Sequence, residues 1–172
     1  MKFDSPYNPK ETEDKIYKLW EKSDFFNPDR LPPPSAGQAA KRNKKFSVMM
    51  APPNITSSLH MGHVLENTEV DILVRMKRMK GFKTLWLPGI DHAGIAAQNV
   101  VEKELRKKGL RRQDLGREKF EKKVKEWKEK YGRLILDQLK MLGISADWSR
   151  TRYTLDTDYT KAVAEAFSYY YK

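Results

Sequence analysis

All three histidines of this 172-residue chain lie in two short segments, His60 and His63 in His60-Met61-Gly62-His63 and His92 further along. Histidines scattered through a core would be the ordinary structural use of this residue, and the clustering argues against it. Two imidazoles three residues apart lie on one face of a helix and can donate hydrogen bonds to one phosphate group. Gly62 has no side chain, so a nucleotide could approach the backbone closely between them.

The elements around His60 and His63 are those of a strand–helix–strand unit. Residues 46–50 are apolar almost throughout, as in a strand covered on both faces, and residues 83–87 give a second short strand. Such a unit implies parallel strands and a right-handed crossover. A helix that begins directly after the first strand presents unpaired N–H groups where doubly wound sheets bind nucleotides. The sequence predicts this helix over residues 59–80, capped by Gly81, with an inward apolar stripe of Leu65, Ile72, Met76 and Met79.

The His-x-x-His spacing also raises the possibility of a zinc site. Zinc needs a third ligand and usually a fourth, which Asp91 or His92 could supply. The chain has no cysteine, however, and the pattern differs from that of helical zinc proteases. We therefore expect no metal site, although a metal role and a purely structural role for the pair remain open.

Four more helices are expected. The first follows Asn8 as cap, with Pro9 at the first helical position, Glu11 completing a capping box, and a stripe of Ile16, Leu19 and Trp20. Others are predicted over 94–108, over 118–142, and from Asp156 or Asp158 to the end. The apolar face of the longest helix would consist of Phe120, Val124, Trp127, Tyr131, Leu134, Gln138 and Met141. Residues 1–44 read as an N-terminal helix and linker, and residues 45–172 as one α/β domain.

The composition restricts the possible partners and locations. Lys and Arg number 34 against 23 Asp and Glu, a net charge of +11, which favours polyanions such as nucleotides or nucleic acid but also suits a merely solubilising surface. The absence of cysteine excludes disulfides. No stretch approaches the roughly 20 apolar residues of a membrane span, and residues 1–5 lack the apolar core of a secretory signal. We expect a cytoplasmic protein with no membrane partner.

The segments that hold the histidines resemble class I aminoacyl-tRNA synthetases. His60-Met61-Gly62-His63 is similar to their HIGH signature, which small nucleotidyltransferases share. Residues 51–56, Ala-Pro-Pro-Asn-Ile-Thr, and residues 85–98, Leu-Trp-Leu-Pro-Gly-Ile-Asp-His-Ala-Gly-Ile-Ala-Ala-Gln, look like the valine–tRNA ligase branch rather than the isoleucine or leucine branches. Residues 75–81 and 147–150 also fit, so the similarity covers nearly the whole chain from the first helix onward.

The resemblance implies an α/β fold, a partial Rossmann-like (HUP-type) parallel sheet with flanking helices and a short N-terminal helix. It also implies a reaction in which valine and ATP, with Mg2+, form valyl-adenylate and pyrophosphate before the acyl group passes to tRNA(Val). His60 and His63 would stabilise charge on the phosphates, and Asp91 would hold the amino group of valine. The other residues implied at the site are, for ATP, Met61, Gly62, Gly89 and Gly94, and, for the amino acid, Pro53, Asn54 and His92, with Gln98 also lining it.

Two of these assignments have an ordinary alternative. Asp91 could cap the following helix, and Asn54 could serve only the turn after two prolines. Four positions depart from the common family pattern: Ala51, Ser57, Ile90 and Ala97 stand where proline, glycine, threonine and threonine are usual. Ile90 puts in doubt any contact of a hydroxyl beside Asp91.

The lysine-containing KMSKS loop, the editing domain and the anticodon-binding helices of that family have no counterpart in this sequence. We therefore expect a truncated catalytic segment with an exposed apolar face, weak activity at most, and a C-terminal part of the enzyme as a possible partner. Two alternatives are a complete small nucleotidyltransferase and a catalytically silent tRNA-binding module that uses the +11 charge.

Overall fold

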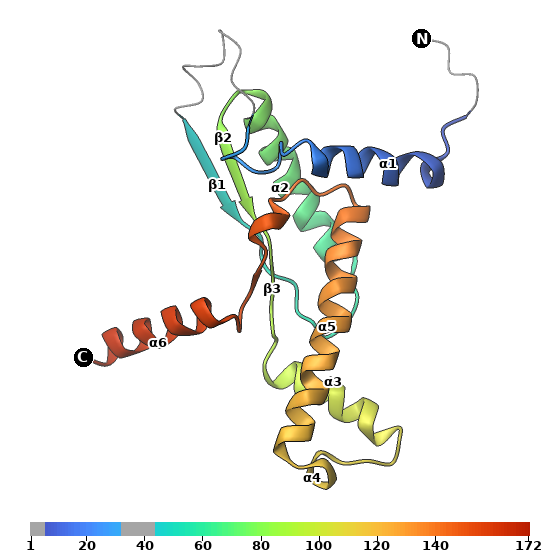
Figure 1. Cartoon of the computed structure of the whole chain (residues 1–172), viewed down its shortest axis with the longest axis vertical. Helices are drawn as coiled ribbons and strands as arrows, with labels where there is room; N and C mark the ends of the chain where they lie inside the picture. The colour runs from blue at the N-terminus through green and yellow to red at the C-terminus, as the bar shows by residue number, and fades with distance from the viewer. Residues whose placement is uncertain (1–5, 32–43) are drawn as a thin grey trace.

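The structure, a computed structural model, describes residues 6–31 and 44–172. Its centre is the expected strand–helix–strand unit. Strand β1 (Lys45–Met49) pairs in parallel with β2 (Lys83–Leu87), from Lys45 opposite Lys83 to Met49 opposite Leu87. Helix α2 (Met61–Met79) makes the crossover between them (Figure 1). The predicted domain boundary at residue 44 adjoins residues 32–43, so most of the predicted linker lies outside the described residues.

The face of α2 that points inward is polar, and the predicted apolar stripe was wrong. Of the side chains of α2, those of Asn67, Asp71 and Val74 are buried, whereas the predicted residues are exposed, Met79 to 84%. Asp71 accepts hydrogen bonds from Ser145 N and Oγ and from Arg75 Nε, and Arg78 donates to Ser145 O at 2.7 Å. Hydrogen bonding offsets the cost of burying these charges, an arrangement that hydrophobic periodicity does not detect.

A second short parallel pair continues the chain toward the candidate site. Strand β3 (Gly89–Ile90) pairs with β4 (Arg152–Tyr153), and an isolated bridge joins Asn54 to Asp91. The segment leading into β4 contains the 3-10 turn Trp148–Arg150. These pairings bring together three segments that are separate in the sequence: the one after β1 at Asn54, the one from β3 to Asp91, and β4.

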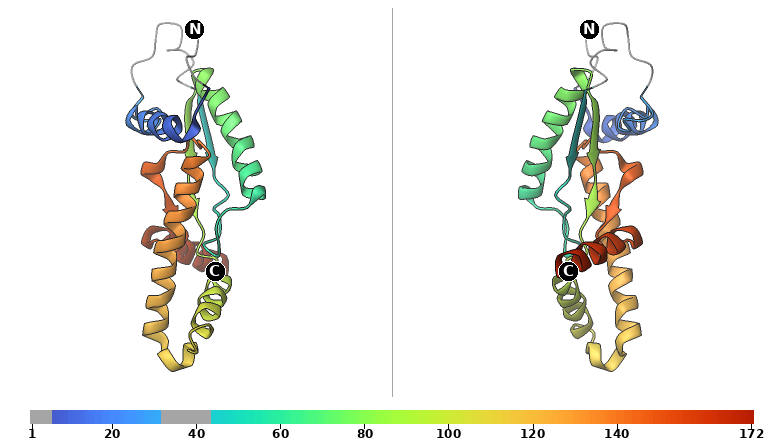
Figure 2. Two further views of the ribbon diagram at one scale, coloured as in Figure 1. Left: turned by 90° about the vertical axis from the view of Figure 1, so that its right-hand side faces the viewer. Right: turned by 90° about the vertical axis from the view of Figure 1, so that its left-hand side faces the viewer.

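Helices α3 (Ile95–Arg106), α4 (Arg112–Leu115) and α5 (Arg117–Met141) form an arm that extends away from the strands (Figures 1 and 2). Val101, Leu105 and Phe120 form the small core of this arm. Closer to the strands, α5 buries Gly132, Ile135 and Leu139. The predicted apolar face of α5 therefore points inward only in the first half of the helix. In the second half, the predicted residue Met141 is 78% exposed.

The main core lies where α2, β2 and α5 meet. Trp86 of β2 is fully buried there. The cluster consists of Met50, Ile55, Val74, Trp86, Ile90, Ala97, Ile135, Leu139, Ile144 and Ala146. Within the described residues, no helix is both long and apolar enough to cross a membrane.

Helices α1 (Pro9–Lys22) and α6 (Thr157–Tyr171) lie at the periphery and bury none of their side chains fully. The predicted capping box of α1 was wrong, because the Asn8 side chain donates to the Glu11 carboxylate instead of capping the backbone. Tyr17 attaches α1 by donating to Ile144 O at 2.6 Å. Asp156, one of the two predicted starts, caps α6 by accepting from Tyr159 N at 2.8 Å.

Several large apolar side chains are exposed on two helices, although the predicted exposed face of the sheet stays a prediction. Beyond the polar inner face of α2, its outward side carries large apolar side chains in solvent, and so does α6. On α2 these are Met61, Leu65, Ile72, Leu73, Met76 and Met79, and on α6 Val163, Phe167, Tyr169, Tyr170 and Tyr171.

Candidate functional site

The two histidines of the His60–His63 segment form the first turn of α2. His60 is the N-cap, and its Nδ1 accepts a hydrogen bond from Gly62 N at 3.1 Å. His63 reaches back, and its Nδ1 accepts from His60 N at 3.2 Å. The two rings stack with centroids 3.8 Å apart. The segment thus caps its own helix in the reciprocal manner of a capping box, with imidazoles in the usual place of hydroxyl and carboxylate.

These hydrogen bonds set the protonation pattern of both rings. An Nδ1 atom that accepts from a backbone N–H carries no proton, so the neutral ring has its proton on Nε2. His60 and His63 can therefore each donate from Nε2. Burial is the main cause that lowers the pKa of His63 from its usual value of 6.5, and electrostatic repulsion from His60 is the second. The neutral ring therefore dominates near pH 7.

Gly62 has a further reason to be glycine. A Cβ added there would lie 2.9 Å from Cε1 of His60, so any side chain would displace the capping imidazole. Met61, the first residue of α2, has an exposed side chain. The unpaired N–H groups of this helix start and two Nε2–H donors together suit an anion.

Asp91 lies beside the segment that follows β1. Asp91 N donates to Pro53 O at 2.8 Å, and Ile55 N donates to Asp91 O at 3.0 Å. This backbone pairing confirms that Pro53, Asn54 and Asp91 are neighbours. Asp91 does not cap the next helix, whose N-cap is Gly94, so that alternative was wrong.

Thr154, which the sequence analysis missed, completes this cluster. Its hydroxyl donates to Asp91 Oδ1 at 2.7 Å, and it also lies 2.9 Å from the backbone nitrogen and 2.5 Å from Nδ1 of His92. The side chains of His92 and Asp91 remain 35% and 32% exposed. Thr154 lies 63 residues from Asp91 and matches no motif, so the sequence alone held no signal for it.

A tight turn leads from this cluster into α3. Ala93 and Gly94 both adopt positive φ, at 56° and 48°. A non-glycine residue in the left-handed region carries strain, which is concentrated at functional sites. Gly94 also has ψ of −119°, a combination open only to glycine. The turn therefore fixes the direction in which His92 leaves the backbone.

The remaining predicted residues divide between site and core. Gly89 is buried, and a Cβ there would lie 3.3 Å from Arg152 O, so it permits the close pairing of β3 with β4. Gln98 is exposed on α3. Ile90 and Ala97 belong to the main core. The hydroxyl beside the Asp91 carboxylate is that of Thr154.

The two groups, His60–His63 and the cluster of Asp91, His92 and Thr154, are not joined by any hydrogen bond or ion pair among the described residues. The described residues also include no cluster of three or more potential His, Cys, Asp or Glu metal ligands.

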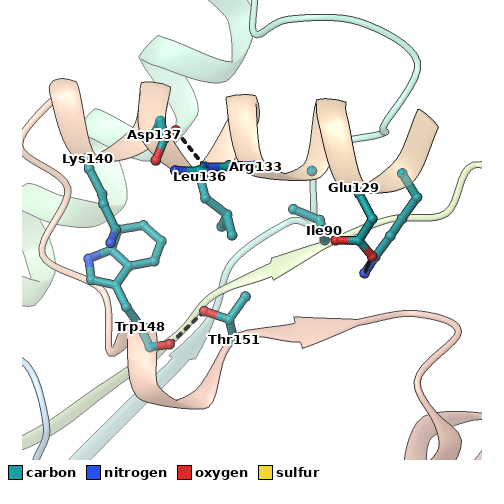
Figure 3. Close-up of a pocket in the computed structure, with 10 residues that line it drawn as sticks. Ile90, Glu129, Arg133, Leu136, Asp137, Lys140, Trp148 and Thr151 are labelled. Atoms are coloured by element: carbon teal, nitrogen blue, oxygen red, sulfur yellow. Dashed lines mark hydrogen bonds and ion pairs between the residues drawn. The ribbon is translucent and has the colours of Figure 1, made fainter. Parts of the chain in front are cut away.

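The two largest of three cavities in the described part of the chain lie elsewhere in the molecule. One of about 780 Å³ separates α1 from the end of α5. The other, of about 290 Å³, lies between α5 and the segment 148–151 (Figure 3). Ile90 borders it, and Leu136 and Trp148 face one another across it. Neither cavity is lined by Asp91 or by a histidine.

Comparisons with known proteins agree with the motif. Residues 15–172 match the family described as tRNA synthetases class I (I, L, M and V). The valine–tRNA ligase of Carboxydothermus hydrogenoformans is 54% identical over 165 residues, 95% of this chain and 17% of the relative. That of Helicobacter pylori is 51% identical over 168 residues, 96% of this chain and 18% of the relative.

A solved structure shows the same fold at low sequence identity. It is the LeuRS–tRNA–LeuAMS ternary complex from Agrobacterium radiobacter, with a TM-score of 0.72 and 22% identity over 96% of this chain and 18% of that chain. The expected Rossmann-like (HUP-type) α/β fold is thereby confirmed. The chain spans less than a fifth of the length of these relatives, and it belongs to the class I tRNA synthetase family.

Proposed function

We propose that this chain carries the phosphate-binding and amino-group-binding parts of an active site that forms valyl-adenylate from valine and ATP. The observation that carries the proposal is the pair of imidazoles stacked at the start of α2, whose Nδ1 atoms accept from the helix backbone and so leave each Nε2 to donate. The similarity to valine–tRNA ligases over nearly the whole chain supports valine as the amino acid.

In the proposed reaction, the carboxylate of valine attacks the α-phosphorus of ATP and pyrophosphate leaves. His60 and His63 donate from Nε2 to phosphate oxygens and so offset the negative charge that develops there. They act by position and hydrogen bonding rather than by proton transfer, because a neutral imidazole holds its Nε2 proton too tightly to give it up near neutral pH. Mg2+ arrives bound to ATP as part of the substrate, a role that needs no protein cage of carboxylates.

At the other end of the adenylate, Asp91 binds the ammonium group of valine. A half-exposed carboxylate next to a sharp backbone turn can accept a charge-assisted hydrogen bond without leaving water entirely. Pro53 and Asn54 are paired with Asp91 through the backbone, and in this proposal they contact the same amino acid. Met61, Gly62, Gly89 and Gly94 keep the backbone within reach of the nucleotide.

We extend the proposal to tRNA(Val) as the acceptor. Residues 103–130 of the arm contain thirteen Lys and Arg against six Asp and Glu, a net charge of +7 out of +11. This concentration of positive charge suits the phosphate backbone of RNA. We further propose a cytoplasmic location, where bacterial translation takes place, because the relatives named above are bacterial.

The test is thermal stabilisation by non-hydrolysable adenylate analogues that carry valine, isoleucine, leucine, methionine or threonine. We expect the largest shift with the valine analogue, and no shift in Asp91→Asn or in the His60→Ala, His63→Ala double variant. Equal shifts with all five analogues would overturn the assignment to valine. Salt-sensitive RNA binding without any analogue binding would instead support the silent tRNA-binding module.

A further inference from the structure

The hydroxyl of Thr154 lies at the centre of the cluster that holds Asp91 and His92. Three polar atoms surround Thr154 Oγ1: Asp91 Oδ1 at 2.7 Å, His92 N at 2.9 Å and His92 Nδ1 at 2.5 Å. Thr154 itself is held by its backbone, since Thr154 N donates to Ile90 O at 3.2 Å next to the β3–β4 pair. One side chain from the segment after β4 therefore contacts two of the four predicted amino-acid-binding residues, Asp91 and His92.

The contacts of this cluster indicate that Nδ1 of His92 carries a proton, and the same Nδ1 also lies 3.2 Å from Asp91 Oδ1. A hydroxyl has one hydrogen, and an ionised carboxylate can only accept, so the Thr154 hydrogen goes to Asp91 Oδ1. The backbone N–H of His92 donates to the same hydroxyl oxygen. The contact of His92 Nδ1 with that oxygen can then be a hydrogen bond only if Nδ1 carries the proton. The neutral ring of His92 consequently has a bare Nε2, which can accept.

His92 is therefore the opposite tautomer of the two histidines at the start of α2. His60 and His63 have bare Nδ1 atoms and donate from Nε2, whereas His92 donates from Nδ1 and accepts at Nε2. Donors suit an anion such as phosphate, and acceptors suit a cation such as ammonium.

We infer that Thr154 is a positioning residue that holds the Asp91 carboxylate in place and sets the tautomer of His92, so that Asp91 and His92 Nε2 form a pair of acceptors for the ammonium group of the substrate. This inference rests on the proposed function and adds to it the residue that orients the amino-group site. A threonine hydroxyl has the geometry for it, because its Cβ is branched and its rotamer is restricted.

The experiment compares Thr154→Val, which keeps the shape but removes the hydroxyl, with Thr154→Ser, which keeps the hydroxyl. Thr151→Val is the matched control, because Thr151 lies in the same segment and its hydroxyl bonds only to Trp148 O at 2.8 Å. The first readout is the tautomer of His92, from nitrogen-15 chemical shifts of the imidazole ring in the ligand-free chain. The second is the affinity for the valyl-adenylate analogue.

We expect the Nδ1–H form of His92 in the wild type, Thr154→Ser and Thr151→Val, and a mixture of tautomers in Thr154→Val. The analogue should bind about tenfold more weakly to Thr154→Val, because this variant loses one hydrogen bond to a charged group. Its affinity for Thr154→Ser and Thr151→Val should be nearly that for the wild type. An Nε2–H form of His92 in the wild type, or an unchanged tautomer in Thr154→Val, would overturn the inference. Absence of analogue binding by the wild type would overturn the proposed function. The tautomer of His92, measured without ligand in the wild type and in Thr154→Val, would still show whether Thr154 sets it.

Discussion

The two halves of the candidate site are built in opposite ways. The His60–His63 turn is local, because its two hydrogen bonds join residues two and three positions apart. The Asp91 cluster is assembled from distant segments, with Thr154 bonding across 62 and 63 residues. A local turn needs only the start of a helix, whereas the cluster requires that β3 and β4 first pair. The first half can therefore be recognised in a sequence, and the second only in a fold.

The difference extends to their chemistry. Capping ties up Nδ1 of both α2 histidines and leaves donors outward, while Thr154 ties up Nδ1 of His92 and leaves an acceptor outward. The hydrogen-bond partner of each Nδ1 thus decides which charge the ring can bind. An aminoacyl-adenylate has a negative phosphate at one end and a positive ammonium at the other, which matches this arrangement.

The largest expected effect comes from Asp91→Asn. The amide keeps the size of the side chain and removes its charge, so the ammonium group of the substrate loses a charge-assisted hydrogen bond. We expect about 100-fold weaker binding of the valyl-adenylate analogue, about 3 kcal/mol. Isothermal titration would measure it. Asp137→Asn is the control, because Asp137 is an exposed carboxylate on α5 outside the site, and equal weakening by both changes would contradict the assignment.

Next in size is the effect of the histidines of α2. His60→Ala should weaken ATP binding and also destabilise the chain by about 1 kcal/mol, the usual cost of losing an N-cap. His60→Asn separates the two roles, because asparagine is a good cap but cannot replace an imidazole donor. We expect it to restore the free energy of unfolding, measured with urea, without restoring ATP affinity. Full recovery of ATP affinity in His60→Asn would show that the imidazole serves only as a cap.

Ile90→Thr tests whether this departure from the family pattern affects the site. Ile90 is 5% exposed, and its Cδ1 would lie 2.9 Å from a Cβ added at Gly132, so it packs against α5 rather than toward a ligand. We expect a loss of about 1–2 kcal/mol in the free energy of unfolding and less than a twofold change in analogue affinity. A large gain in affinity would show that a hydroxyl at position 90 does reach the site.

The smallest expected effect is a dependence of stability on pH. His63 has a pKa lowered by burial and by His60, below the usual 6.5 of the unfolded chain. The unfolded chain therefore binds more protons in mildly acidic solution, and the free energy of unfolding should fall as pH drops through 6.5. Above that pH this contribution is fully present. Urea unfolding across this range would measure it, and a His63→Gln variant with the same pH dependence would contradict it.

The sequence predicted most of the elements and one half of the site. The βαβ unit followed from two short apolar runs around a helix, and the histidine turn followed from residue spacing. The inner face of α2 could not be predicted, because the buried Asp71 and the half-buried Arg78 both bond to Ser145, 74 and 67 residues away. Thr154 was missed for the same reason, since a lone threonine gains its meaning only from the strand pairing that brings it to Asp91.

The central claim is that both halves bind one ligand, and the three histidines allow a direct measurement. Titrating the nitrogen-15-labelled chain with the valyl-adenylate analogue would report each imidazole separately. We predict that the resonances of His60, His63 and His92 all shift with one common dissociation constant, the first two as Nε2 donors and the third as an Nε2 acceptor. Shifts at only one of the two segments, or two different dissociation constants, would contradict a single site.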